Sequence, residues 1–490
     1  MGAFNDIPDN IRVPIVAIEF DNSGAVTGTP GLLYKLLVIG QMLPTASVEP
    51  LTAHRITSEN QGEALFGRGS MLAEMLRYAR KANSFLEVWA IGQQELAAGA
   101  AAAGSITVAA AATSAGTLAL YIAGERLQIG IQAGKTPAEL AAAIVAGINA
   151  NTRQPLIAAV NGVDDAKVDL TCRWKGETGN TIHVQANYYV GEVLPPGLAL
   201  TVVQPTGGSG NPDVGEAIAV MGDEWWNAVA MPYTDAANLA VLKQELLDRW
   251  GPLRALDGLA YAAFRGTHAS TGTFGNLHNN QLLTVMGCNE ALTPPYLWAA
   301  VDAIVATQAL NNDPARPLKT LPLPGLLPAP KEKQWTLEER NLLLYDGIST
   351  HTVDREGKVL IERQITTYQD NAAGLPDPSY LDVTTPATLG YFRYANRVRI
   401  TQKFPRCKLA PDGTRYAPGQ PIVTPKVVRA ELLALYRELE WAGLVSNYDD
   451  YAESLLVWID ENDPNRLNVH GRPNLVNGFN IMAMKAAFIV

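Results

Sequence analysis

Three segments decide the fold: GLLYKLLVIG at residues 31–40, SMLAEMLRYARKA at 70–82 and FLEVWAIG at 85–92. The outer two are apolar runs that predict strands at 32–39 and 86–91. The middle one predicts a helix, because four apolar residues share one face: Leu72, Met75, Leu76 and Ala79. The alternation returns after residue 215, with helices expected near 214–222, 235–250 and 295–310 and strands at 228–232, 258–264 and 282–287. It predicts an α/β fold with mixed sheets flanked by helices.

Between these two α/β stretches, residues 96–205 differ in composition and pattern. Ala and Thr dominate, and period-two alternation at 105–108 and 117–122 predicts a pair of strands. A helix is expected at 137–149, where Thr136 and Glu139 form a capping box, and further strands at 168–174 and 182–189. The uncharged stretch 96–124 is long enough to cross a bilayer, but its glycines and its period favour strands. We therefore predict an α+β domain, 96–205, inserted into an α/β domain made of 31–95 and 206–330.

The rest of the chain is organised around one proline-rich stretch and the two ends. Residues 321–330 are interpreted as an extended linker. Residues 331–477 are expected to form a C-terminal α/β module, with a helix at 337–344, a hairpin turning at 355–358 and a helix at 425–442. Residues 1–30 and 478–490 are expected to be extended arms. The prediction is a multi-domain α/β protein with an inserted α+β domain and two arms.

Composition limits the functional classes. The chain has 490 residues, 47% of them hydrophobic and 18% charged, which is typical of a folded globular protein. Its formal net charge of −10 argues against a general binder of nucleic acid or of an anionic membrane. The three cysteines lie more than a hundred residues apart, which predicts neither a disulfide framework nor a zinc ribbon.

No motif predicts catalysis. GIQAGKT at 130–136 is similar to a phosphate-binding loop, but its glycines enclose three residues where that loop needs four. A turn before a capped helix is the better interpretation. GGSG at 207–210 lacks the final glycine of a nucleophile elbow, and the six histidines never occur at metal-ligand spacing. We expect no enzyme activity, catalytic residue, metal or cofactor; an α/β enzyme whose active site carries no motif is the remaining alternative.

Both ends of the chain carry apolar residues, although free ends are usually polar and fray. In the C-terminal arm these are Phe479, Ile481, Met482, Met484, Phe488 and Ile489. The N-terminal arm offers Arg12, Val13, Ile15, Ile18 and Phe20. The C-terminal arm is either the last strand of its own sheet or a strand added to the sheet of a neighbouring subunit. Two such arms on one chain indicate a protein that assembles.

The expected helix at 425–442, with Thr424 as its N-cap, has a second face of interest. At 100° per residue Lys426, Arg429 and Arg437 fall together, away from the apolar stripe. These three residues form either a solvated face or a basic strip that faces an acidic partner surface.

Several stretches of the C-terminal module resemble a known family. They are YDGIS at 345–349, GKVLIERQITTY at 357–368, RITQKFPR at 399–406, GQPIVTPK at 419–426 and the closing arm. Together they resemble the tail sheath proteins of contractile-tailed bacteriophages, specifically the Mu-like type. Over residues 1–330 the resemblance is mainly architectural: an arm, an α/β core and an inserted domain.

The resemblance implies a structural subunit of stacked six-subunit rings around a rigid tail tube, assembled in the host cytoplasm and carried in the virion tail. It implies partners: other copies of the chain, the tube protein, and baseplate and tail terminator proteins, with neither nucleic-acid binding nor membrane insertion. The arms would complete a sheet in neighbouring subunits, the helix from residue 425 would face the tube, and 96–205 would lie outward. The sheath of a related injection machine, from a bacteriocin or a secretion apparatus, is the alternative.

Overall fold

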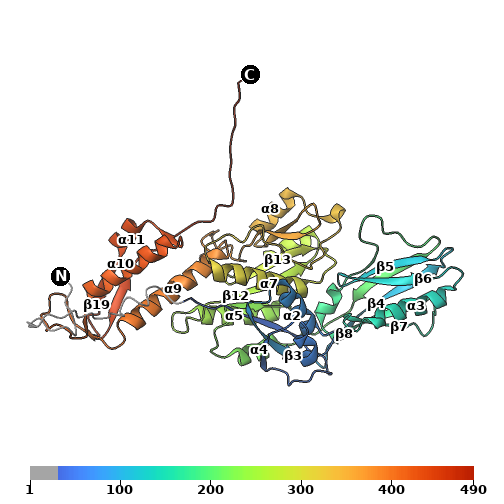
Figure 1. Cartoon of the computed structure of the whole chain (residues 1–490), viewed down its shortest axis with the longest axis horizontal. Coiled ribbons are helices and arrows are strands. Elements are labelled where there is room, and N and C mark those ends of the chain that lie inside the picture. The colour runs from blue at the N-terminus through green and yellow to red at the C-terminus, as the bar shows by residue number, and fades with distance from the viewer. Residues whose placement is uncertain (1–30, 490) are drawn as a thin grey trace, which may run out of the picture. The chain divides into compact units, whose positions relative to one another are not determined.

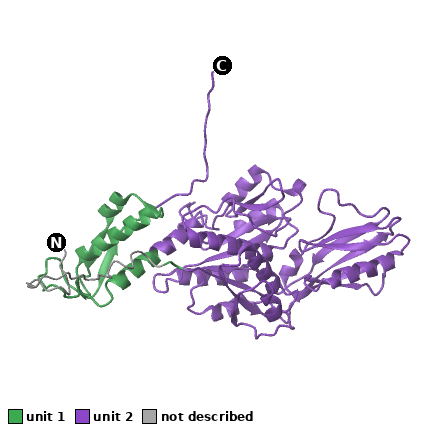
Figure 2. Cartoon of the chain, in the orientation of Figure 1, with its two compact units in different colours: residues 1–32, 393–474 green, residues 33–392, 475–490 purple. Residues whose placement is uncertain are grey.

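The computed structural model of the chain describes residues 31–489, and these divide into two compact units (Figure 2). Of the described residues, unit 1 comprises 31–32 and 393–474, and unit 2 comprises 33–392 and 475–489. The residues of the expected N-terminal arm lie outside the described part of the chain.

A six-stranded sheet forms the centre of unit 2, with the strand order β13-β12-β11-β1-β3-β2. The five parallel strands are β1 (Lys35–Gln41), β3 (Glu87–Gln93), β11 (Ala228–Ala230), β12 (Leu259–Arg265) and β13 (Leu283–Asn289). The short β2 (Ala53–Ile56) adds an antiparallel edge. In β1 the residues 36–39 are completely buried, because a parallel sheet is covered on both faces, and this explains why the strands appear as continuous apolar runs.

Helices cover both faces of this sheet (Figure 1). On one side α2 (Met71–Ala82) and α7 (Pro295–Asn312) pack against each other and against β1, and α1 (Gln61–Phe66) contacts α2. The crossovers through α4 (Val214–Met221), α5 (Ala236–Trp250) and α6 (His268–Gly275) run in the opposite direction from β1, which places them on the other face. Sequence patterning missed the short elements β2, α1 and α6 here.

The inserted domain consists of two antiparallel sheets and one helix. The four-stranded sheet has the order β10-β4-β8-β7, with β4 (Ala101–Ala110), β7 (Leu156–Val160), β8 (Lys167–Lys175) and β10 (Ala199–Thr206). The three-stranded sheet has the order β6-β5-β9, with β5 (Gly116–Ile122), β6 (Glu125–Ile131) and β9 (Val184–Ala186). The helix α3 (Pro137–Ala150) begins with the predicted capping box of Thr136 and Glu139, and a 3₁₀ turn covers Glu177–Thr181.

The first two expected strands of this domain are both present, but they belong to different sheets. β4 pairs with β8 and β10, whereas β5 pairs with β6 and β9, so the two strands lie in different sheets. Period two identifies the buried face of a strand but not its neighbour. The inward residues of both strands, such as Ile106 and Leu120, contribute to one core.

The stretch expected as a linker is packed into unit 2. Leu323, Leu326 and Ala329 are buried, and the Leu323 amide donates to the Val359 carbonyl at 2.9 Å. This stretch lies beside the hairpin of β14 (Thr350–Val353) and β15 (Val359–Arg363), which follows the 3₁₀ turn Lys331–Lys333 and helix α8 (Leu337–Tyr345). A bridge between Met286 and Ser349 joins the hairpin to β13. The expected module 331–477 is therefore divided in the structure, and its first part belongs to unit 2.

Unit 1 is built on two long helices and small sheets. Helix α9 (Thr384–Lys403), which sequence patterning did not predict, begins in unit 2 and ends in unit 1. Helix α10 (Pro425–Trp441) buries the predicted stripe of Val428, Leu432, Leu435 and Leu439. The shorter elements are β16 (Lys408–Leu409), β17 (Ile422–Val423), β18 (Val445–Ser446), α11 (Tyr448–Ser454), β19 (Leu456–Ile459), β20 (Leu467–His470) and β21 (Asn474–Leu475).

Candidate assembly surfaces

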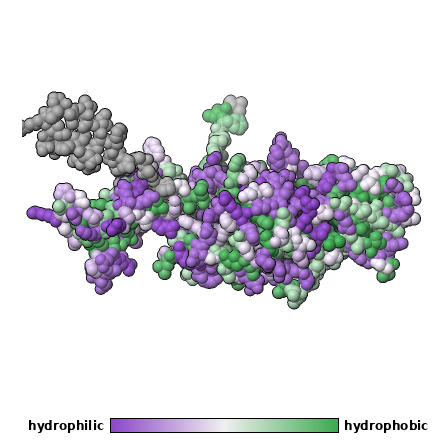
Figure 3. Space-filling model, turned by 60° about the horizontal axis from the view of Figure 1, so that its bottom comes forward, coloured by the Kyte–Doolittle hydropathy of each residue, from purple (hydrophilic) through white to green (hydrophobic). Residues whose placement is uncertain are grey.

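The C-terminal arm has neither helix nor strand over residues 478–489, and it pairs with no strand of the described chain. Its apolar side chains are exposed, for example Phe479 at 70% and Phe488 at 86%. Figure 3 shows the end of the arm as a hydrophobic segment. Near its start, Lys319 donates from Nζ to the Phe479 carbonyl, and the ammonium lies 5.4 Å from the centre of the Phe479 ring. In the described part of the chain, the arm is therefore not the last strand of a sheet in its own subunit, which was the first of the two interpretations.

Unit 1 contains a second feature with unpaired main-chain groups, the hairpin of β19 and β20. β19 and β20 form an antiparallel hairpin of only two strands, with Val457 opposite Val469 and Ile459 opposite Leu467. Helix α10 contacts β19, and the opposite face of the hairpin exposes Leu456 (58%). Within residues 31–489 no further strand pairs with either outer edge of this hairpin. Such a hairpin is only marginally stable alone, and its edges offer free donors and acceptors to another chain.

The three residues of the basic strip have different environments. Lys426 and Arg437 are exposed, and the Arg437 guanidinium lies 4.2 Å from the centre of the Tyr448 ring. Arg429 is half-buried and donates to the Leu455 carbonyl at 3.1 Å and to the Ala452 carbonyl. Arg429 therefore holds the end of α11 in place. Thr424 occupies the N-cap position as predicted, but its hydroxyl makes no capping hydrogen bond.

An ion cluster that sequence reasoning missed joins α9 to α10. Arg399 donates from Nη1 to Glu431 Oε1 at 2.8 Å and from Nη2 to Glu438, and Lys403 donates to Glu431 at 3.0 Å. Burial raises the pKa of Glu431, but the hydrogen bonds from Arg399 and Lys403 outweigh it, so the net shift is downward. Glu431 and Glu438 lie two turns apart on α10. This spacing alone does not predict an ion cluster, because its basic partners are on α9, which was not predicted.

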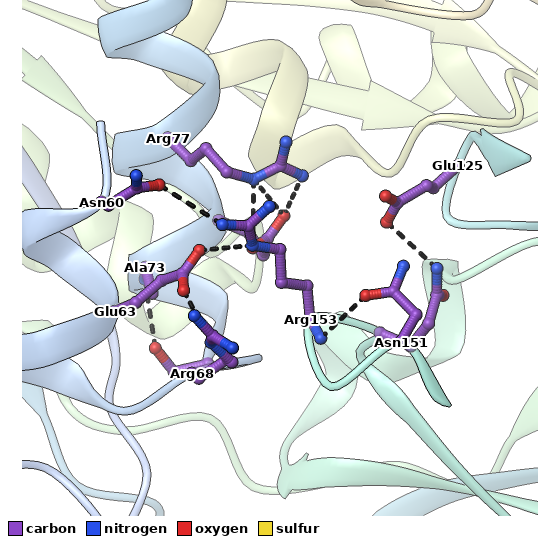
Figure 4. Close-up of polar contacts among 11 residues, drawn as sticks. Asn60, Glu63, Arg68, Ala73, Arg77, Glu125, Asn151 and Arg153 are labelled. Carbon is purple, nitrogen blue, oxygen red and sulfur yellow. Dashed lines mark hydrogen bonds and ion pairs between the residues drawn. The ribbon is translucent and has the colours of Figure 1, made fainter. Parts of the chain in front are cut away.

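Polar contacts also fasten the inserted domain to the core of unit 2 (Figure 4). The buried carboxylate of Glu63 on α1 accepts from Arg68 Nε at 2.7 Å and from Arg153 Nε, in the inserted domain, at 2.5 Å. Inside the inserted domain, Gln154 donates to Glu125 at 3.0 Å and orders the loop that carries Arg153. At this junction, one buried carboxylate is therefore paired with an arginine of the core of unit 2 and with an arginine of the inserted domain.

Close packing completes this junction. The rings of Trp174 and Tyr296 meet edge to face at 5.9 Å, and the Tyr188 hydroxyl donates to the Pro328 carbonyl at 3.2 Å. Gly124, at a φ of +83°, lies so close to Thr293 that a Cβ there would be 2.4 Å from the Thr293 hydroxyl oxygen. The inserted domain and the core of unit 2 are therefore in close contact at this junction.

His268 and His278, which lie close together in the sequence, have separate environments in the structure. His268 contacts the Glu339 carbonyl at 3.0 Å, and His278 packs beside Phe274, so the two histidines do not converge on a shared site. Over residues 31–489 no group of three or more His, Cys, Asp or Glu side chains is placed to hold a metal ion. No helix within that range combines the length and the hydropathy needed to cross a bilayer.

Comparison with known proteins identifies the family. Three family descriptions match: "Phage tail sheath protein beta-sandwich domain" at residues 97–199, "Phage tail sheath protein central domain" at 207–367 and "Phage tail sheath C-terminal domain" at 376–489. A Mu-like prophage FluMu tail sheath protein from Haemophilus influenzae is 46% identical over 488 residues, which cover 100% of this chain and 99% of the relative. The chain therefore belongs to the phage tail sheath proteins, and its full-length relative is of the Mu-like type.

A solved structure supports the same fold. The sheath tail protein from Desulfitobacterium hafniense is 14% identical, with a TM-score of 0.50, and the match covers 95% of this chain and 97% of that one. The sheath tail protein Lin1278 from Listeria innocua is 13% identical with a TM-score of 0.48, covering 92% and 93% of the two chains.

Proposed function

We propose that this chain is the subunit of a contractile tail sheath, which polymerises as stacked six-subunit rings around a tail tube and contracts to drive the tube through the host envelope. The observation that carries the proposal is the presence, in one chain, of an unpaired apolar arm and a hairpin with two open edges. Each feature is a liability in a monomer. When the arm of one copy adds a strand to the hairpin of another, the unpaired main-chain groups form hydrogen bonds and the apolar side chains of the arm become buried.

The arm is long enough for this exchange. Twelve extended residues, 478–489, span up to about 40 Å, so the arm can reach beyond the surface of its own subunit. Main-chain hydrogen bonds along β19 or β20 supply affinity, and each apolar side chain that becomes buried contributes about 1.5–3 kcal/mol. Arms that connect every copy to its neighbours form a mesh that stays intact while the subunits move.

Contraction, in this proposal, rotates nearly rigid subunits from a metastable arrangement to one with more buried interface. The Glu63 junction and the Trp174 contact support rigid movement, because they lock the inserted domain to its core. Contacts with the tube and baseplate hold the extended state. A gain of a few kcal/mol per subunit suffices, because a long tail sums that gain over many copies, and no nucleotide is required.

We further propose that α10 faces the tube and that the inserted domain lies outward. Lys426 and Arg437 are the exposed cations of the basic strip, suited to an acidic tube surface, and Arg429 supports the strip from behind. Baseplate and tail terminator proteins would bound the polymer at its two ends. Assembly would take place in the host cytoplasm, before the sheath becomes part of the virion.

Negative-stain electron microscopy of the purified full chain over a range of concentrations tests this function. We expect hollow, helically striated tubes, formed by the chain alone or on added tube protein. K426E/R437E should still form sheath tubes but should associate with tube protein more weakly. The matched reversal K81E/K243E changes two exposed lysines of unit 2 and should have no such effect. Dispersed single subunits under every condition, with tube protein included, would contradict the proposal.

A further inference from the structure

Among the described residues of unit 1, the most exposed aromatic side chain lies at the end of α10. Trp441 is 92% exposed, and its indole borders a shallow hollow of about 730 Å³. The other lining residues are Arg437, Glu440, Asn447, Tyr448, Asp449 and Asp450. A tryptophan with so little contact contributes almost nothing to folding, and large rings of this kind are typical anchors of protein interfaces.

The hollow around Trp441 is acidic. Asp449 and Asp450 are exposed and have no ion-pair partner in the described chain, and Glu440 accepts a hydrogen bond from the Tyr448 amide at 3.2 Å. The one cation in the lining, Arg437, already stacks on the Tyr448 ring. The surface therefore presents an aromatic face beside uncompensated carboxylates, which suits a partner that offers guanidinium groups.

Unit 1 carries such a partner surface at the other end of the same helix. The segment 404–416, here called the basic loop, exposes Arg406, Lys408 and Arg415. Neither of its arginines has an ion pair among the described residues, and Tyr416 beside them is 44% exposed. The loop is fixed at the start of α10, because the Lys408 amide donates to the Pro421 carbonyl at 2.7 Å and the Lys426 amide donates to Asp412 at 3.0 Å.

The two surfaces cannot meet within one subunit. Helix α10 has 17 residues and is about 25 Å long, and the basic loop and the Trp441 hollow lie at its opposite ends. The sequence shows the same separation of charge. Residues 393–429 contain nine basic residues and one acidic residue, and residues 430–463 contain nine acidic residues and one basic residue.

We propose that the Trp441 hollow receives the basic loop of a second copy of this chain. In this contact an arginine of the loop stacks on the indole of Trp441 and pairs with Asp449 or Asp450. The contact is heterologous, since it joins two different surfaces, and contacts of that kind build rings or helical polymers. It rests on the proposed self-assembly and adds to it a specificity contact that is separate from the exchange of arms.

A charge swap tests the contact in the full chain. D449K/D450K makes the hollow basic, and R406E/R415E makes the loop acidic. In either variant alone, the hollow of one copy and the loop of the next carry charges of the same sign and repel each other. Mixed, the two variants restore opposite charges in both alternating contacts. We expect each variant to need at least about ten times the protein concentration of the unaltered chain for assembly in light scattering, and an equimolar mixture to assemble near the unaltered concentration.

Controls separate this contact from general effects of charge and folding. D164K/D165K makes the same change of charge on the inserted domain and should assemble normally, W441A should weaken assembly without any change of charge, and circular dichroism should show all variants folded. The inference would be overturned, and the proposed function left standing, if D449K/D450K assembled at the same protein concentration as the unaltered chain. The same holds if the mixture needed as high a concentration as each variant alone. A loss of tube-protein binding without a loss of self-assembly would also overturn it. Failure of the unaltered chain to assemble would overturn the proposed function together with this contact.

Discussion

Among single residues, two buried ionisable groups in the core of unit 2 have opposite effects on stability as pH changes. Asp302 accepts from Gln364 Nε2 at 2.7 Å, and burial raises its pKa to about 7. His351 contacts the Gly287 carbonyl at 3.0 Å, and burial lowers its pKa to about 4. Between about pH 4 and 6.5 the folded chain keeps the Asp302 proton and leaves His351 neutral, whereas the unfolded chain loses the Asp302 proton and protonates His351. The two effects on the pH dependence of the unfolding free energy have opposite signs and nearly cancel.

Replacing Asp302 by Asn removes one side of this balance. The folded chain keeps the Asp302 proton in a range where the unfolded chain loses it, so Asp302 lowers stability as pH rises from about 4 to 7. The free energy of unfolding of D302N relative to the unaltered chain should therefore increase by about 3 kcal/mol over that range. Urea unfolding at pH 4, 5.5 and 7 measures it. A difference that stays constant with pH would show that Asp302 titrates normally.

At the scale of elements, sequence patterning worked where one face of a segment is buried in its own unit. Helices α2, α3 and α10 have regular apolar stripes or complete capping signals, and they were predicted within a few residues. Helix α9 was missed because Pro386 and Gly390 interrupt its pattern and because ion pairs of Arg399 hold it. The partners of β4 and β5 could not be predicted for a different reason, because alternation carries no information about which strand lies next to which.

The same distinction applies to the candidate assembly surfaces. The arm was predictable, because its apolar residues fall on both faces of an extended segment and need a partner on both. The role of Arg429 was not, since its acceptors are main-chain carbonyls of residues that carry no special signature. The Trp441 hollow also needed the structure, because α11 brings Asp449 beside the end of α10.

The ion cluster between α9 and α10 predicts a marked effect of a single substitution. Arg399→Met removes the 2.8 Å ion pair of the largely buried Glu431 and the pair with the half-exposed Glu438, and we expect a loss of about 2 kcal/mol of unfolding free energy. Lys403→Met is the matched control: its side chain is about half exposed and should cost less than about 1 kcal/mol. Urea unfolding followed by circular dichroism checks both. Equal effects of the two variants would contradict the importance assigned to Arg399.

At the scale of the whole molecule, the sequence indicated an α/β protein with an inserted domain but placed one boundary differently from the structure. Proline-rich composition at 321–330 suggested a linker, whereas its apolar residues are buried beside β14 and β15. The division between the two compact units falls inside α9, after residue 392, where no change of composition marks it. Packing of segments far apart in sequence decided that boundary, and single-sequence patterns carry no information about it.

The most direct test of the central claim removes the arm. A chain ending at residue 477 should remain folded and monomeric, with unchanged circular dichroism, because the arm contributes little to the core of its own subunit. It should form no long tubes in electron microscopy under conditions where the full chain forms them. A full-length variant with Met482→Asp and Met484→Asp keeps the length of the arm but places two charges on one face of it, and it should behave in the same way. Long tubes from the truncated chain would contradict the account.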